Sequence, residues 1–145
     1  MRLNTMAAVM SYVSKIENDS ASFYENNSEN YPELKDTFVC WAKENRKFEK
    51  NIKRTYFGVI TDTLESNFAF EGLDTDDYGI EALLSESADR AEVIKKVHNI
   101  EGAIKNFYLK AAQLSEGLMA DIPRLFRKIA KTREQRWQAI EIPIE

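Results

Sequence analysis

The feature that most constrains this fold is a regular spacing of apolar side chains over residues 34–56. Apolar residues recur there at alternating intervals of four and three positions, which places them on one face of an α-helix and not on one face of a β-strand. The series is Leu34, Phe38, Trp41, Phe48, Ile52 and Tyr56, with the polar Asn45 in its middle. A helix with such a stripe must bury it against other helices, so the pattern predicts a helical bundle.

Three further segments show the same periodicity: about 6–28, about 80–115 with a possible break near 85–87, and from near Asp121 to before Pro143. Pro32 lies between the first two helices, where it predicts a short turn. Residues 57–77 lose the periodicity but keep apolar anchors, so this stretch predicts a long crossover. Five Gly and three Pro are few for the many turns of a sandwich or barrel.

The pattern therefore predicts an all-α fold in one domain over residues 1–145. Two helical hairpins joined by a long crossover are typical of a four-helix bundle of ferritin-like topology. In such a bundle, apolar side chains of the crossover form a candidate surface for self-association, and we expect a homo-oligomer, as a dimer. These side chains are Phe57, Phe68 and Phe70, and the alternative is that they cap the ends of the bundle.

Charge and composition restrict the classes of binding partner and the cellular compartment that we expect for this protein. The formal net charge is −4, which disfavours nucleic acid or an anionic membrane as the main partner, and no apolar run approaches the roughly 18 residues of a membrane span. Cys40 is the single cysteine, so an internal disulfide is excluded and a reducing, cytoplasmic location is predicted. His98 is the single histidine, so a site that needs two histidines cannot be built on one chain.

The sequence repeats itself in the same order. Five positions of the first helix recur in the third, and three positions of the second recur in the fourth, which indicates a duplicated helical hairpin. The first set is Val13, Ile16, Glu17, Phe23 and Tyr24, which recurs as Val97, Ile100, Glu101, Phe107 and Tyr108. The second set is Phe38, Ala42 and Lys43, which recurs as Phe126, Ala130 and Lys131.

This order of Glu, Phe-Tyr, a turn and Phe-x-x-x-Ala, present twice, resembles the rubrerythrin-like branch of the ferritin-like superfamily. The resemblance implies a pair of metal ions held by one Glu from each odd helix and a Glu-x-x-His from each even helix. Glu17 and Glu101 match the odd-helix ligands. The Glu-x-x-His positions hold other residues: Asn45 and Phe48 on the second helix, and Arg133 and Arg136 on the fourth. The resemblance therefore implies a degenerate di-iron site, in which four of the six expected metal ligands are replaced by other residues.

The apolar stripes alone, without the family resemblance, predict that the residues at these ligand positions face the interior of the bundle. Asn45 lies on the stripe of the second helix, and Arg133 lies between apolar positions of the fourth, so both should face Glu17 and Glu101. A guanidinium neutralises a buried carboxylate with paired donors, and this pairing predicts a carboxylate pKa below the ordinary range. We therefore predict an ion-pair core of Glu17, Glu101, Asn45, Arg133 and Arg136 in place of metal. The alternative is that Arg133 and Arg136 extend outward to solvent and leave the stripe to Ile129, Trp137 and Ile140, with Trp137 in place of Arg136.

A second interpretation keeps a metal ion. His98 lies three positions before Glu101, within reach of the same helix face, so Glu17, Glu101 and His98 form a reduced ligand set. In that case iron is the expected cofactor, and the protein is a non-haem iron oxidoreductase or peroxidase with atypical ligands. Without metal, no cofactor is expected.

The missing ligands favour a non-catalytic module for binding or assembly, and no catalytic residue is assigned. A regulatory or stress-related helical protein without redox chemistry is the other hypothesis that stays open. No phosphate-binding glycine loop and no Cys/His or Ser/His/Asp nucleophile set can be assembled from this chain. Whether the protein is an enzyme is not decided by the sequence.

Overall fold

A computed structural model describes residues 1–60, 69–84, 89–116 and 121–140 of the chain. These residues are mainly helical, and no β-strand occurs among them. The helices are α1 (Met6–Asn30), α2 (Lys35–Ile60), α3 (Ile80–Leu83), α4 (Arg90–Leu114) and α5 (Asp121–Ala139), with single 3-10 turns at Pro32–Leu34 and Thr75–Asp77. The predicted all-α class is therefore confirmed for this part of the chain.

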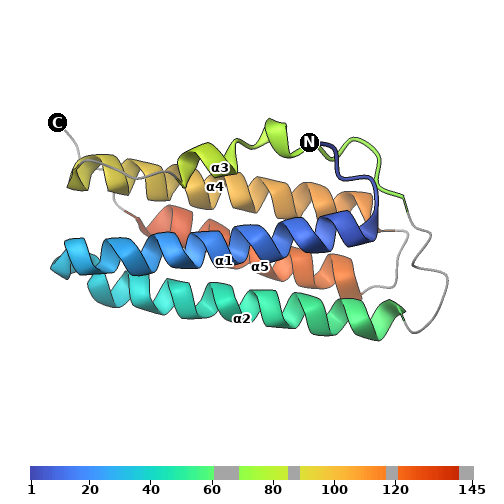
Figure 1. Ribbon diagram of the computed structural model, residues 1–145, viewed down its shortest axis with the longest axis horizontal. Helices are drawn as coiled ribbons and strands as arrows, with labels where there is room; N and C mark the ends of the chain where they lie inside the picture. The colour runs from blue at the N-terminus through green and yellow to red at the C-terminus, as the bar shows by residue number, and fades with distance from the viewer. Residues whose placement is uncertain (61–68, 85–88, 117–120, 141–145) are drawn as a thin grey trace.

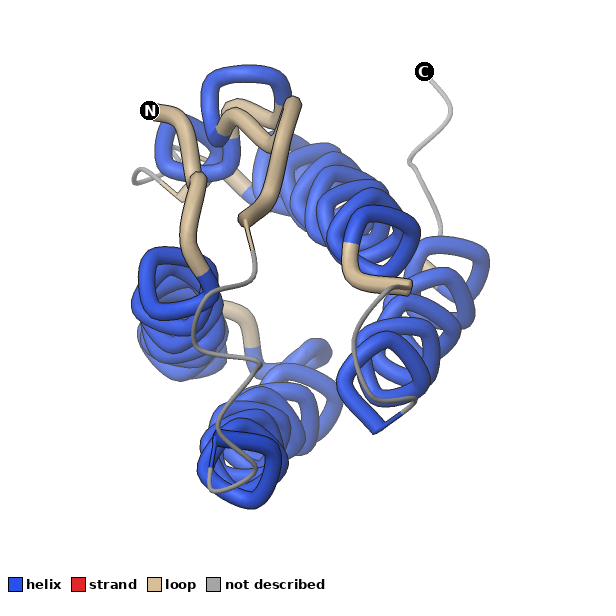
Figure 2. The backbone as a smooth tube through the Cα atoms, turned by 90° about the vertical axis from the view of Figure 1, so that its right-hand side faces the viewer, coloured by secondary structure: helices blue, strands red, loops and turns tan. Residues whose placement is uncertain are grey.

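The four long helices lie side by side, as Figures 1 and 2 show. α1 packs most extensively on α2, and α4 packs most extensively on α5, so each half of the chain contributes one hairpin. α2 also contacts α5. The short helix α3 packs on α4, and in Figure 2 it lies on the side of the molecule away from α2 and α5.

Local signals explain where the helices begin. The Oγ1 atom of Thr5 accepts a hydrogen bond from the backbone N–H of Ala8 and caps α1, and the carboxylate of Asp89 caps α4 by accepting from Glu92. These side chains satisfy N–H groups that have no partner inside a helix. Because α4 begins at Arg90 after its cap, the third predicted helix is not continuous from residue 80. The suspected break near 85–87 lies outside the described residues.

The N-terminal segment pairs with the end of the crossover. The N–H of Leu3 donates to the carbonyl of Leu73, and the N–H of Phe70 donates to the carbonyl of Asn4, both at 2.8 Å. Leu3, Phe70 and Leu73 are buried and belong to the main core. Burial of Phe70 corrects the prediction that it contributes to an exposed surface. Phe57 is 63% exposed at the end of α2, and Phe68 lies outside the described residues.

Between the hairpins the core contains charged side chains among apolar ones. The apolar part includes Ile16, Phe38, Ile104 and Phe126, all buried. The buried charged side chains at mid-length are Glu17, Glu101, Arg133 and Arg136, which occupy the predicted stripes, and α2 adds the buried Glu49 beside its stripe. Among the described residues, no helix is both long enough and apolar enough to cross a membrane.

Candidate functional site

The five residues predicted for the ion-pair core lie together in the structure. Glu17 comes from α1, Asn45 from α2, Glu101 from α4, and Arg133 and Arg136 from α5. Each is at most 3% exposed. The helical stripes thus bring one polar position from each of α1, α2 and α4, and two from α5, to the same level of the core.

Arg133 joins the two hairpins through a single guanidinium group. Its Nη1 donates to Oε2 of Glu101 at 2.5 Å, and its Nη2 donates to Oε1 of Glu17. The planar group presents its donors in a fixed geometry, so it can bind carboxylates on two sides at once. Arg133 is therefore the central residue of the cluster.

Arg136 extends the cluster towards the surface between α2 and α5. Its Nη1 donates to Oε1 of Glu101 and to Oδ1 of Asn45, each at 2.8 Å. Its Nη2 donates to Oε1 of Glu44 at 2.9 Å, and the Glu44 side chain is 43% exposed. Glu44 was not predicted as a member of the cluster, because it lies off the apolar stripe of α2.

Two further polar residues add hydrogen bonds to the cluster, while the buried Nε atoms of Arg133 and Arg136 have no partner within the described residues. The hydroxyl of Tyr108 donates to Oε2 of Glu17 at 2.7 Å, and the side-chain amide of Asn45 donates to the hydroxyl of Ser20 at 3.0 Å. Tyr108 and Ser20 were missed as site residues. Both lie on apolar stripes of the sequence, which was the available signal, but a buried tyrosine or serine is ordinary in a helical core.

Aromatic rings cover the guanidinium groups. The ring of Phe48 lies 5.9 Å from the guanidinium carbon of Arg133 and 5.6 Å from that of Arg136, and the ring of Trp41 lies 5.0 Å from that of Arg136. Cations are attracted to aromatic faces at such distances, and the attraction is stronger where water is excluded. Phe48 therefore occupies a position that the resemblance assigns to a metal-binding histidine and instead stabilises arginine.

Burial and pairing have opposite effects on the titrating groups. Burial raises the pKa of the Glu17 carboxyl above its ordinary value, although Arg133 and the hydrogen bond from Tyr108 act in the other direction. Burial alone lowers the pKa of Arg133, but the carboxylates of Glu101 and Glu17 outweigh it and raise that pKa. The expectation of a lowered carboxylate pKa is therefore wrong for Glu17, because desolvation exceeds the effect of pairing.

His98 lies in a different environment from the carboxylates. Its ring stacks on Trp137 with centroids 4.6 Å apart, and its buried Nδ1 atom has no hydrogen-bond partner among the described residues. No three His, Cys, Asp or Glu side chains in the described segments are grouped so that they could hold a metal ion. The structure thus does not assemble Glu17, Glu101 and His98 into one ligand set.

The donor chemistry of the cluster does not fit a pair of metal ions. Every side-chain oxygen of Glu17 and Glu101 accepts a hydrogen bond, from Arg133, Arg136 or Tyr108. An arginine guanidinium stays charged and has no lone pair for coordination. It would also repel a cation placed between the same carboxylates.

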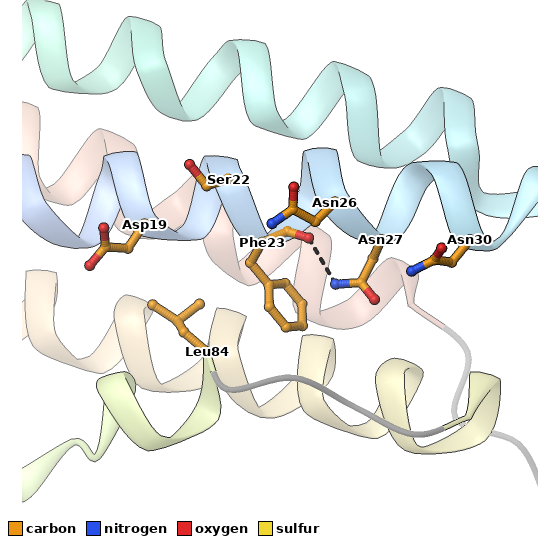
Figure 3. Close-up of a pocket in the computed structure, with 7 residues that line it drawn as sticks. All are labelled: Asp19, Ser22, Phe23, Asn26, Asn27, Asn30 and Leu84. Atoms are coloured by element: carbon orange, nitrogen blue, oxygen red, sulfur yellow. Dashed lines mark hydrogen bonds between the residues drawn. The ribbon is translucent and has the colours of Figure 1, made fainter.

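A separate hollow of about 450 Å³ lies along α1, as Figure 3 shows. The side-chain amide of Asn27 donates to the carbonyl of Phe23 at 2.8 Å at its edge. None of the predicted site residues lines this hollow. The lining residues are Asp19, Ser22, Phe23, Asn26, Asn27, Asn30 and Leu84.

Comparisons with known proteins do not identify a family for this chain. No protein-family model, no curated protein and no solved structure matches the chain. These comparisons neither support nor refute the resemblance to rubrerythrin-like proteins. The geometry of the buried cluster is therefore the basis for a functional proposal.

Proposed function

We propose that the chain is a four-helix bundle of ferritin-like topology that acts as a non-catalytic module for binding or assembly. In this proposal an arginine–carboxylate cluster takes the position of a di-metal centre. The observation that carries it is the placement of Arg133, which is 0% exposed and donates to both Glu17 and Glu101. A fixed cation thus already neutralises the carboxylates that a metal would need.

The closure of the cluster supports a structural role for it. The side chains of Glu17, Glu101 and Arg133 are completely buried, and the first two use both oxygens in hydrogen bonds. A catalytic carboxylate needs access to a substrate or to a mobile proton. Carboxylates that are enclosed in this way and bonded to an arginine from another helix support a role in holding the helices together, although the buried Nε atom of Arg133 has no partner within the described residues.

Iron uptake tests the proposal. The chain, purified without a metal-affinity tag, is incubated with Fe(II) without oxygen and then exposed to air, and bound iron is counted per chain. We expect iron far below stoichiometry and no near-ultraviolet absorption of an oxo-bridged pair. Near-stoichiometric iron with that absorption would overturn the proposal and favour the alternative, a non-haem iron oxidoreductase or peroxidase with atypical ligands.

A variant with the ligands restored provides the matched comparison. Asn45→Glu, Phe48→His, Arg133→Glu and Arg136→His together place carboxylate and imidazole at each position where the resemblance requires them. We expect this variant to take up iron under conditions in which the parent does not. A folded variant that takes up none would contradict the ferritin-like geometry of the core.

A further inference from the structure

Acidic residues gather on one side of the molecule. Residues 69–84 contain five carboxylates and no Lys or Arg. This segment lies with the N-terminal residues on the side of Figure 2 away from α2 and α5. We call its exposed carboxylates the acidic face: Glu71, Asp76, Asp77 and Glu81.

Basic residues line the opposite side in spite of the net charge of −4. On α2 and α5 they recur at intervals of four and three, so each set follows one stripe of its helix. We call these exposed residues the basic face: Lys43, Lys47, Lys50 and Arg54 on α2, with Arg124, Lys128 and Lys131 on α5. Within the described residues only Arg124 among them forms an ion pair, a 3.8 Å contact with Asp121.

A groove of about 250 Å³ runs between α2 and α5 within the basic face. Its lining combines the apolar side chains of Phe48, Leu125 and Ile129 with the exposed Lys47 and Lys128. It also includes Glu44, whose carboxylate is paired with Arg136. A groove that combines apolar side chains with exposed lysines fits an apolar side chain that is surrounded by carboxylates.

The acidic side presents such a side chain. Met1 is 65% exposed, the highest value among the exposed large apolar residues of the described segments. Its ammonium group pairs with Asp74 at 3.0 Å and with Asp76 at 3.1 Å, and Arg2 lies beside Asp74. The carboxylates of the acidic face that form no ion pair within the described residues are therefore Glu71, Asp77 and Glu81. An unbranched methionine side chain adapts readily to an irregular apolar hollow.

We propose that the basic face binds the acidic face of a second copy of this chain, with Met1 inserted in the groove between α2 and α5. This inference deepens the proposed assembly role and does not depend on the metal content of the core. Because the two faces lie on opposite sides, the contact is head-to-tail. Contact between two basic faces would place Lys47 and Lys128 against like charges, which is unfavourable.

In an open assembly, head-to-tail contact leaves one unbound acidic face and one unbound basic face at the two ends. Such contacts give rings or open chains and not a closed two-fold dimer. The association should also weaken with salt, because the paired groups are exposed and screening shortens the range of their attraction to about 4 Å near 0.5 M NaCl. Size as a function of concentration and salt therefore distinguishes this contact from a two-fold dimer.

Complementary variants test the contact by sedimentation. Lys47→Gln with Lys128→Gln neutralises the two lysines of the groove, and Glu71→Gln with Asp77→Asn neutralises two carboxylates of the acidic face. In the parent we expect the weight-average mass at about 200 µM to reach at least twice that of the 16.8 kDa monomer and to fall towards it in 0.5 M NaCl. Each double variant alone should remain monomeric.

An equimolar mixture of the two double variants retains one productive pair of faces and should form a 1:1 dimer and nothing larger. Lys35→Gln with Lys95→Gln, which removes two exposed lysines outside the basic face, should leave parental association unchanged. Asn51→Trp fills the groove without changing charge and should abolish association. A monomeric parent, an associating Asn51→Trp variant or a mixture that stays monomeric would each overturn the contact, whatever the iron measurement shows.

Discussion

The hydroxyl of Tyr108 donates a 2.7 Å hydrogen bond to Glu17 and so connects the second hairpin to the first inside the core. In the sequence repeat, Tyr24 corresponds to Tyr108. The hydroxyl of Tyr24 is buried and has no hydrogen-bond partner among the described residues, whereas the two side-chain oxygens of Glu101 accept from Arg133 and Arg136. The arginines of α5 therefore break a symmetry that α1 and α4 share in sequence.

This asymmetry predicts unequal effects for two matched substitutions. Tyr108→Phe leaves Oε2 of Glu17 buried without a donor, and we expect it to reduce the free energy of unfolding by about 1–3 kcal/mol. Tyr24→Phe removes a hydroxyl that has no partner, so it should be nearly neutral or stabilising. Urea unfolding of both variants measures the difference. Equal losses would contradict the unequal hydrogen bonding of the two tyrosines.

Arg133→Met tests the central ion pair. The substitution keeps apolar bulk but leaves Glu17 without its nearest cation, and breaking a buried pair in this way costs on the order of 3–5 kcal/mol. Arg127→Met removes a pairing with Glu116 at the surface and should have a far smaller effect. Urea midpoints at neutral pH compare the two variants. A loss for Arg133→Met as small as that for Arg127→Met would exclude a stabilising buried cluster.

The loss caused by Arg133→Met should grow with pH. In the parent, burial raises the folded-state pKa of Glu17, so its contribution to stability is greatest below the unfolded value and declines as pH rises through the folded pKa. Without Arg133 that pKa rises further, and the decline extends to higher pH. The gap between parent and variant should therefore be smaller near pH 5 than near pH 8. Urea midpoints at both pH values, in metal-free buffer, measure it.

The inward position of the cluster was predictable because helical periodicity is a local property. Glu17, Asn45, Glu101 and Arg133 each occupy a position where an apolar residue would continue a stripe, so their burial follows from spacing alone. Arg136 was ambiguous, because it and the adjacent Trp137 both lie near the edge of the stripe. In the structure Arg136 is buried, whereas Trp137 is half-buried against α4.

Interactions between distant segments were not predictable in this way. The N-terminal residues pair with the end of the crossover, as in the bond from Leu3 to Leu73, and no turn signal connects two segments so far apart. The same reasoning explains why Phe70 was expected at the surface. Its burial depends on that pairing and not on a local pattern. The pairing of Arg136 with the off-stripe Glu44 likewise depends on how α2 meets α5.

Gly102→Ala should destabilise the protein although alanine is the better helix former. A Cβ atom at this position would lie 3.2 Å from both Cδ1 and Nε1 of Trp137, so the indole, which is stacked on His98, must shift by a few tenths of an ångström. That movement would disturb the stacking of Trp137 on His98 and its contact with Lys105. A changed tryptophan emission and a lower urea midpoint are the expected results.

A double-mutant cycle separates this clash from helix propensity. In a Trp137→Leu background the indole is gone, so Gly102→Ala should lose most of its cost and show the gain of about 1 kcal/mol that alanine brings to a helix interior. Urea unfolding of the parent, both single variants and the double variant provides the coupling free energy. Gly102→Ala that is stabilising in both backgrounds would show that the indole does not pack against α4 at Gly102.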